Sequence, residues 1–270
     1  MLAIKNNIMA ANAARHLGRS YDALAKSVER LASGLRINSS KDDAAGLAVR
    51  ELMRADIAVL QQGSRNAQDG ISLLQVAEGG MQTINNLIVR MKQLAEQAAT
   101  GTYSSAQRTI MNSEFDELSS EISRIASSAK FNNISMLDSA SGDIAVVFGS
   151  STDTITIDMK DMTESGLLID ALSINNEADA MSALATLDTA IDTANTARAD
   201  FGAKMNRLEN TVGVIDVQVE NLQASESRVS DVDVATEMSA MTRNQVLAQA
   251  GISMLAQANL MPQMALTLLR

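Results

Sequence analysis

Apolar residues recur every three or four positions near both ends of this 270-residue chain, and this spacing constrains the fold more than any other feature. The repeat near the start consists of Ala10, Ala14, Leu17, Tyr21, Leu24, Val28, Leu31 and Leu35. The repeat near the end consists of Val234, Met238, Met241, Gln245, Ala248, Ile252, Leu255 and Asn259. Heptad spacing keeps one stripe of a helix facing a partner along its length. It therefore predicts terminal helices that pack against each other or against copies of the chain, an arrangement for assembly rather than catalysis.

The composition favours long α-helices. The chain has one proline, 2% aromatic residues and 46% hydrophobic residues, which are mainly Ala, Leu, Ile, Val and Met. Such residues rarely break helices, and few of them favour strands. We expect a mainly α fold, with long heptad helices that form a terminal coiled-coil domain and a helical-bundle domain with a small β-hairpin.

Polar segments divide the helical pattern. The first helix is expected at about 7–35 and a second, very long one at about 44–99. A third follows the turn at 100–105, a fourth begins near Glu177, and a last one follows a polar break at 225–233.

Two segments with alternating apolar residues, 143–148 and 153–159, predict a hairpin near 143–160, with its connection at 149–152. Because the polar break at 38–43 mirrors the one at 225–233, both flanks are expected to cross the same domain boundary. The sequence thus predicts an inner domain of residues 1–42 and 229–270 and a rod domain of residues 43–228.

The charge balance excludes several partners. The formal net charge is −10 and the sequence pI is about 4.6, so the surface repels nucleic acid and anionic lipid. Residues 1–15 contain no apolar run long enough for a secretory signal. Residues 244–269 carry no charge, but Pro262 interrupts this stretch and unpaired amides are unfavourable in hydrocarbon. The amides in this stretch are Asn244, Gln245, Gln249, Gln257, Asn259 and Gln263. We therefore expect no membrane span there, but a helix covered by protein.

Signals for catalysis or for a cofactor are weak. The only histidine, His16, lies on the first helix without an obvious partner for acid–base chemistry. The absence of cysteine excludes disulfides and thiolate metal sites. Asp42 or Asp43, and Asp231 with Asp233, are more simply read as N-terminal residues of helices than as metal ligands. We expect no enzyme activity, catalytic residues, cofactor or bound metal.

Long motifs at both ends resemble bacterial flagellin. The amino-terminal ones are "LASGLRINSSKDDAAGLAVRELM" at 31–53 and "RNAQDGISLLQVAEGGMQTI" at 65–84. The carboxy-terminal ones are "FGAKMNRLENT" at 201–211 and "QAGISMLAQANLMPQMALTLLR" at 249–270. The resemblance covers roughly residues 1–137 and 184–270 and implies a short form without the variable outer domains of the family.

The resemblance implies a structural subunit of the extracellular flagellar filament, exported unfolded through the flagellar channel without a cleaved signal peptide. It also implies four kinds of partner: further copies of the chain, an export chaperone, a cap protein and hook-associated proteins. The residues expected to carry filament assembly are Leu17, Leu24, Leu31, Leu35, Ile252, Leu255 and Leu260. Because the terminal seams are rich in small or polar residues, we also expect both ends to become ordered only on assembly.

The resemblance also implies a candidate recognition site for the vertebrate flagellin receptor at Arg90, Leu94 and Glu114 of this chain. Alternatively, Leu94 belongs to a packed stripe and Arg90 to a solvated face or a contact between subunits. Two other functions compete with a filament subunit: a hook–filament junction protein, which shares the heptad ends, and a secreted helical effector or enzyme.

Overall fold

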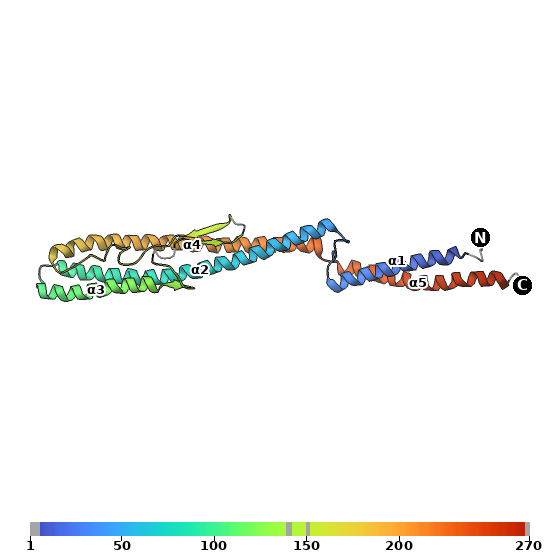
Figure 1. Ribbon diagram of the computed structural model, residues 1–270, viewed down its shortest axis with the longest axis horizontal. Coiled ribbons are helices and arrows are strands. Elements are labelled where there is room, and N and C mark those ends of the chain that lie inside the picture. Colours follow the sequence, from blue (N-terminus) through green and yellow to red (C-terminus); the bar gives the residue numbers. More distant parts are fainter. Residues whose placement is uncertain (1–5, 139–141, 150–151, 268–270) are drawn as a thin grey trace. The chain divides into compact units, whose positions relative to one another are not determined.

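The computed structural model describes residues 6–138, 142–149 and 152–267. Long helices dominate these residues, which confirms the mainly α fold (Figure 1). The elements in chain order are α1 (Ile8–Ser33), α2 (Ala44–Ala99), α3 (Ser105–Ser128), β1 (Lys130–Phe131), β2 (Ile134–Ser135), β3 (Ile144–Val147), β4 (Thr154–Ile157), α4 (Glu177–Ser230) and α5 (Val234–Thr267).

Side-chain caps fix several helix ends. The Asn7 side-chain oxygen accepts a hydrogen bond from the Ala10 N–H at 3.0 Å and so starts α1, which ends at Gly34 with φ +73°. Asp43 caps α2 by accepting from the Gly46 N–H at 2.9 Å. The sequence had left this role open between Asp42 and Asp43, and the geometry assigns it to Asp43.

Two expectations about the last helices were wrong. Residues 225–230 were predicted to break the helical pattern, but α4 continues to Ser230. The Ser225 hydroxyl donates to the Asn221 carbonyl at 2.8 Å, so this serine is satisfied within the helix. Pro262 was expected to interrupt the last stretch, but α5 runs past it to Thr267. A proline removes one backbone donor, and here the helix tolerates that loss.

The two acidic residues between α4 and α5 also differ in role. Asp233 caps α5, because its carboxylate accepts from the Ala235 N–H at 3.0 Å. Asp231 was predicted to be an N-terminal residue of this helix, but it instead forms an isolated antiparallel bridge with Leu35.

The chain divides into two compact units, one made of Met1–Ile57 with Glu220–Arg270 and the other of Ala58–Val219. Both α2 and α4 contribute residues to each unit. The division between these compact units therefore lies inside α2 and α4; the predicted domains of 1–42 with 229–270 and of 43–228 stay a prediction.

The second unit holds the main core. Parts of α2, α3 and α4 enclose large side chains that are at most 1% exposed; these are Leu74, Met81, Ile88, Phe115 and Phe201. In the predicted hairpin, β3 pairs with β4 in antiparallel register from Ile144↔Ile157 to Val147↔Thr154. The predicted connection at 149–152 lies partly outside the described residues.

The β3–β4 hairpin packs closely on α2. The Asn66 side-chain amide donates to the Val147 carbonyl at 2.8 Å. A Cβ atom at Gly63 would overlap the backbone carbonyl of Phe148, so glycine is needed for this close approach.

A second, shorter hairpin of β1 and β2 was not predicted from the sequence. It turns at Asn132 and Asn133, whose φ angles are +49° and +66°. Asparagine tolerates this left-handed region better than most residues, which allows a tight two-residue turn.

Candidate assembly surface

In the first unit, α1 and α5 lie side by side in antiparallel orientation (Figure 1). At one end of the pair, the Asn7 side-chain amide donates to the Ala258 carbonyl at 2.7 Å. At the other end, the Arg30 guanidinium lies 3.4 Å from the Glu237 carboxylate. These two contacts fix the register of the pair.

Small residues bring the two helices close together. Ser27 is 3% exposed and Ala248 is 4% exposed. A Cβ atom at Gly251 would lie 3.1 Å from Leu17 Cδ1, tighter than ordinary contact. A seam made of such residues buries little apolar area, so it contributes modestly to the stability of the pair.

The predicted stripe of α1 was half right. Its members at seven-residue intervals, Ala10, Leu17, Leu24 and Leu31, are partly buried, as a seam requires. The alternate members Ala14, Tyr21 and Val28 are exposed, and the residues one position earlier, Ala13, Ser20 and Ser27, are the buried or partly buried ones. The small residues face α5, and the larger Tyr21 and Val28 do not.

The stripe of α5 is displaced in the same way. Met241, Ala248 and Leu255 are buried or partly buried, as predicted. Met238, Gln245, Ile252 and Asn259 are exposed, and their places in the seam belong to Glu237, Asn244, Gly251 and Ala258.

The expected assembly residues fall into two groups. Leu17, Leu24, Leu31 and Leu255 lie in the seam, and Leu35 lies in the bridge to Asp231. Ile252 and Leu260, each 50% exposed, lie outside the seam.

The faces of α1 and α5 that point away from the seam are rich in exposed apolar side chains. On α1 these are Ile8, Met9, Tyr21 and Val28; on α5 they are Val234, Met238, Val246, Leu247, Ile252, Met254, Leu260, Met261 and Met264. A large exposed apolar surface of this kind is normally covered by protein. We define the exposed apolar residues of these two helices as the candidate assembly surface.

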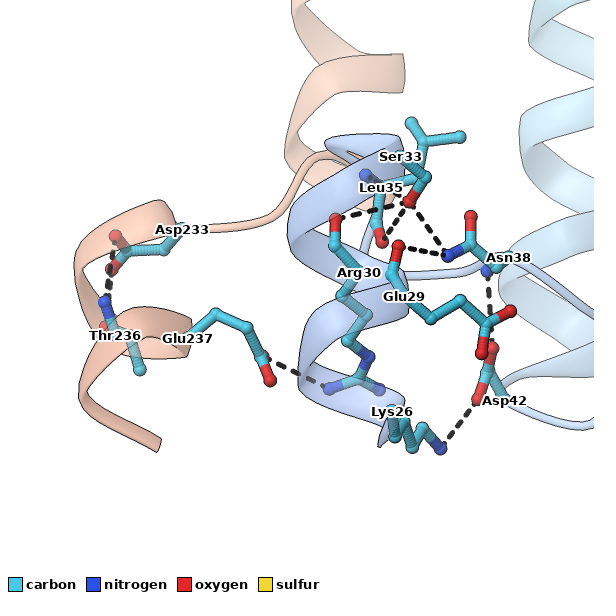
Figure 2. A network of polar contacts seen from close by, with 10 residues as sticks. All are labelled: Lys26, Glu29, Arg30, Ser33, Leu35, Asn38, Asp42, Asp233, Thr236 and Glu237. Carbon is cyan, nitrogen blue, oxygen red and sulfur yellow. Dashed lines mark hydrogen bonds and ion pairs between the residues drawn. The ribbon is translucent and has the colours of Figure 1, made fainter. Parts of the chain in front are cut away.

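Polar contacts hold the segments where the chain leaves α1 and enters α5 (Figure 2). The Asn38 amide donates to the Ser33 hydroxyl at 2.8 Å, and Lys26 forms an ion pair with Asp42 at 2.6 Å. This ion pair, with backbone N–H donors from Asn38 and Ser39, lowers the pKa of the Asp42 carboxyl to about 2. The segment from 38 to 42 therefore depends on an ionised Asp42.

Backbone pairing joins residues 34–36 to the end of α4 and the residues after it. The Arg36 N–H donates to the Ser230 carbonyl at 2.6 Å, and the Val232 N–H donates to the Gly34 carbonyl at 3.0 Å. Arg50, 8% exposed, donates to the Ile37 carbonyl at 2.8 Å. The segments that follow α1 and α4 are therefore held together by hydrogen bonds within the first unit.

The second unit brings together two of the three residues expected at the receptor site. Arg90 donates to one Glu114 oxygen through both Nε and Nη2, at 2.9 and 2.7 Å, and both side chains are about half exposed. Leu94 is 2% exposed in the core. Its position agrees with the alternative, a packed stripe.

The described residues offer little for catalysis. His16 is exposed on α1. In the part of the chain that the structure covers, no cluster of three His, Asp or Glu side chains could hold a metal ion, and no helix is long and apolar enough to cross a membrane.

Comparisons with known proteins match both ends of the chain. The model of the bacterial flagellin N-terminal helical region matches residues 4–141, and that of the C-terminal helical region matches residues 184–269. A flagellin of Halalkalibacterium halodurans is 41% identical over 270 residues, covering 99% of each chain. A flagellar filament 33 kDa core protein of Treponema phagedenis is 43% identical over 287 residues, with the same coverage.

Two solved structures share the fold. The crystal structure of Bacillus cereus flagellin has a TM-score of 0.52 and 33% identity, covering 60% of this chain and 94% of that one. A putative flagellar hook-associated protein from Vibrio parahaemolyticus has a TM-score of 0.59, covering 70% of this chain and 100% of that one. Its 14% identity supports a shared fold alone.

The terminal helices have exposed apolar faces, and the family models match both ends of the chain. Together these features define a helical subunit that assembles with other copies. The chain belongs to the bacterial flagellin family. The similarity spans nearly the whole length of these relatives.

Proposed function

We infer that this chain is a structural subunit of the bacterial flagellar filament, the extracellular polymer for motility, and that it polymerises through α1 and α5. The observation that supports this route is the candidate assembly surface, whose residues point away from the α1–α5 seam. Residues 244–269 carry no charge that would oppose their burial between copies. The role is structural and requires no catalysis.

Truncation tests this role. Deleting residues 249–270 removes Gly251, Leu255 and Ala258 from the seam and much of the exposed face of α5. The truncated chain is expected to stay monomeric in a seeded polymerisation assay, while the second unit keeps its unfolding transition. Normal filaments in negative-stain micrographs of the truncated protein would refute a role of α5 in assembly.

The terminal helices are proposed to become ordered only on assembly. The seam contains Ser27, Ala248 and Gly251, and their small side chains offset little of the entropy lost when two helices are fixed. Hydrogen exchange on the free subunit is expected to be fast in residues 8–33 and slow in the core of the second unit. Slow exchange in residues 8–33 of a monomer would reject this proposal.

The remaining partners follow from the family. We propose a chaperone that binds the carboxy-terminal segment before export through the flagellar channel, and cap and hook-associated proteins at the filament ends. The exposed apolar side chains of α5 support a chaperone, because a free subunit needs them covered. Binding of a purified flagellar export chaperone should be lost on deletion of residues 249–270.

Recognition by the vertebrate flagellin receptor is proposed through Arg90 and Glu114, which form an exposed ion pair. Leu94 is expected to act only through packing, because its side chain is buried. A reporter-cell assay with monomeric Arg90→Ala protein should give a weaker response than the unchanged protein. Silence of the unchanged protein at high concentration would reject receptor recognition.

A hook–filament junction protein is the second candidate, because it would share the heptad helices at both ends. The amount of protein distinguishes the two functions. A filament subunit should be the dominant band near 28.7 kDa in filaments sheared from cells, whereas a junction protein would be a minor band.

A further inference from the structure

All the sulfur of this chain is in methionine, because it has 16 methionines and no cysteine. A methionine thioether reacts with two-electron oxidants such as hydrogen peroxide. The sulfur lone pair attacks one peroxide oxygen, an S–O bond forms as the O–O bond breaks, and water leaves. The sulfur loses two electrons, the peroxide gains them, and a flexible apolar side chain becomes a polar sulfoxide.

The solvent exposure of the described methionines ranges from none to more than half of the side chain. Met81, Met91 and Met136 are 0% exposed in the core of the second unit, where an oxidant cannot reach the sulfur. Other methionines are much more exposed: Met9 on α1 at 68%, and four on α5, Met238 at 47%, Met254 at 64%, Met261 at 38% and Met264 at 51%. The accessible thioethers of the free subunit are therefore concentrated on the helix that carries most of the candidate assembly surface.

Their surroundings make the polar product unfavourable in a polymer. The exposed neighbours Val246, Leu247 and Ile252 are apolar, and no charged residue occurs between 244 and 269. A sulfoxide oxygen is a strong hydrogen-bond acceptor, and these apolar neighbours offer it no donor, although amides such as Gln257 lie on the same helix. Burying it between copies against the apolar neighbours would therefore leave a polar group without a partner, which opposes association.

We propose that Met238, Met254, Met261 and Met264 form an oxidation site for peroxide-class oxidants, and that their conversion to sulfoxides in the free subunit blocks polymerisation. The proposal rests on the proposed function, because it requires α5 to be buried between copies. It adds a chemical control: the same four thioethers are reactive before assembly and shielded after it.

The chain contains a matched control. Met181 lies on α4 in the second unit and is 61% exposed, comparable with Met254. It should be oxidised as readily as the α5 methionines, but its sulfoxide should not affect polymerisation.

The experiment uses the full-length chain treated with hydrogen peroxide, with peptide mass spectrometry to measure the sulfoxide at each methionine. Met9 on α1 is also 68% exposed, so three proteins that all carry Met9→Leu are compared: the otherwise unchanged chain, a variant with all four α5 methionines replaced by leucine, and Met181→Leu. Leucine conserves the volume and apolar character of methionine. Oxidation should raise the critical concentration of the unchanged chain and of Met181→Leu at least about tenfold, equivalent to about 1.4 kcal/mol, and leave the four-leucine variant unchanged.

A second measurement uses the unchanged chain alone. Enzymatic reduction of the sulfoxides should restore polymerisation of the oxidised protein, and peroxide treatment of finished filaments should oxidise Met181 but spare the four α5 methionines. This arm decides the question even if the four-leucine variant does not assemble.

The outcomes separate the two ideas. If the untreated chain never polymerises, the proposed function fails. If the untreated chain polymerises and its oxidised form has the same critical concentration, the oxidation site is refuted and the proposed function stands. Equal inhibition of the four-leucine variant, or no recovery after reduction, would also overturn the assignment to α5.

Discussion

Replacing Ile252 by glutamine tests the candidate assembly surface with a single side chain. Ile252 lies on α5 outside the seam and is 50% exposed in the subunit. Glutamine forms helices well, so α5 and its contact with α1 should be largely preserved. The effect should appear in the polymer, where the exposed half of the side chain becomes buried.

The magnitude follows from that exposed half. Full burial of an isoleucine side chain stabilises by about 1.5–3 kcal/mol, so burying half of it contributes about 1 kcal/mol to assembly. An amide buried without a partner opposes assembly by about 1–3 kcal/mol. The loss of about 2–4 kcal/mol per subunit should raise the critical concentration by about 30- to 700-fold, at about 1.4 kcal/mol per tenfold.

The assay is seeded polymerisation followed by sedimentation, in which the protein left in solution at the plateau gives the critical concentration. Ile110→Gln is the matched control, because Ile110 is 73% exposed on α3 in the second unit. The control should polymerise within about twofold of the unchanged chain. If Ile252→Gln did so too, or if both variants were impaired equally, α5 would not provide the interface.

Three further predictions concern the folded subunit. Gly63→Ala should destabilise the second unit by about 1–3 kcal/mol in urea unfolding, because its Cβ would overlap a backbone carbonyl of the β3–β4 hairpin, whereas Gly202→Ala, with open space around it, should be neutral or stabilising. Leu94→Ala should cost about 2–5 kcal/mol in the same assay, because the side chain is 2% exposed in the core. The Asp42 carboxyl should titrate near pH 2 in the folded chain by NMR, and Lys26→Met should move this midpoint toward the ordinary value of 3.8.

The pH dependence from Asp42 has a definite sign. Its pKa is depressed in the folded chain, so the stabilisation is fully present above the unfolded value and is lost as the pH falls toward about 2. If Lys26→Met left the titration midpoint of the Asp42 carboxyl unchanged, the ion pair with Lys26 would not be the cause of the lowered pKa. For the other two variants, equal behaviour of Gly63→Ala and Gly202→Ala, or a Leu94→Ala loss below about 1 kcal/mol, would contradict the packing described above.

Helix limits followed from the sequence wherever a cap or a glycine marked them. The start of α2 after Asp43 and the end of α1 before Gly34 depend on local chemistry that the sequence contains. The end of α4 was misplaced, because serine and arginine at 225–228 were read as a break although they are compatible with a helix.

The face of each terminal helix could be predicted only in part. Heptad spacing allows the alternate seam position to lie three or four residues away, and the apolar repeat placed Tyr21 and Val28 in the seam. The close approach at Gly251 favours the small residues, and this approach is a property of the pair that neither helix shows alone. The β1–β2 hairpin was missed because two-residue strands carry no detectable alternation.

Asn7 joins the two extremities of the polypeptide in one small structure. Its side-chain oxygen accepts from the Ala10 N–H in the first turn of α1, and its side-chain amide donates to the carbonyl of Ala258 on α5. Fraying at either helix end therefore weakens the other, which makes local unwinding cooperative across 251 residues of sequence. A protease that removes about the last twelve residues should thus also loosen the start of α1, although the enzyme does not cleave there.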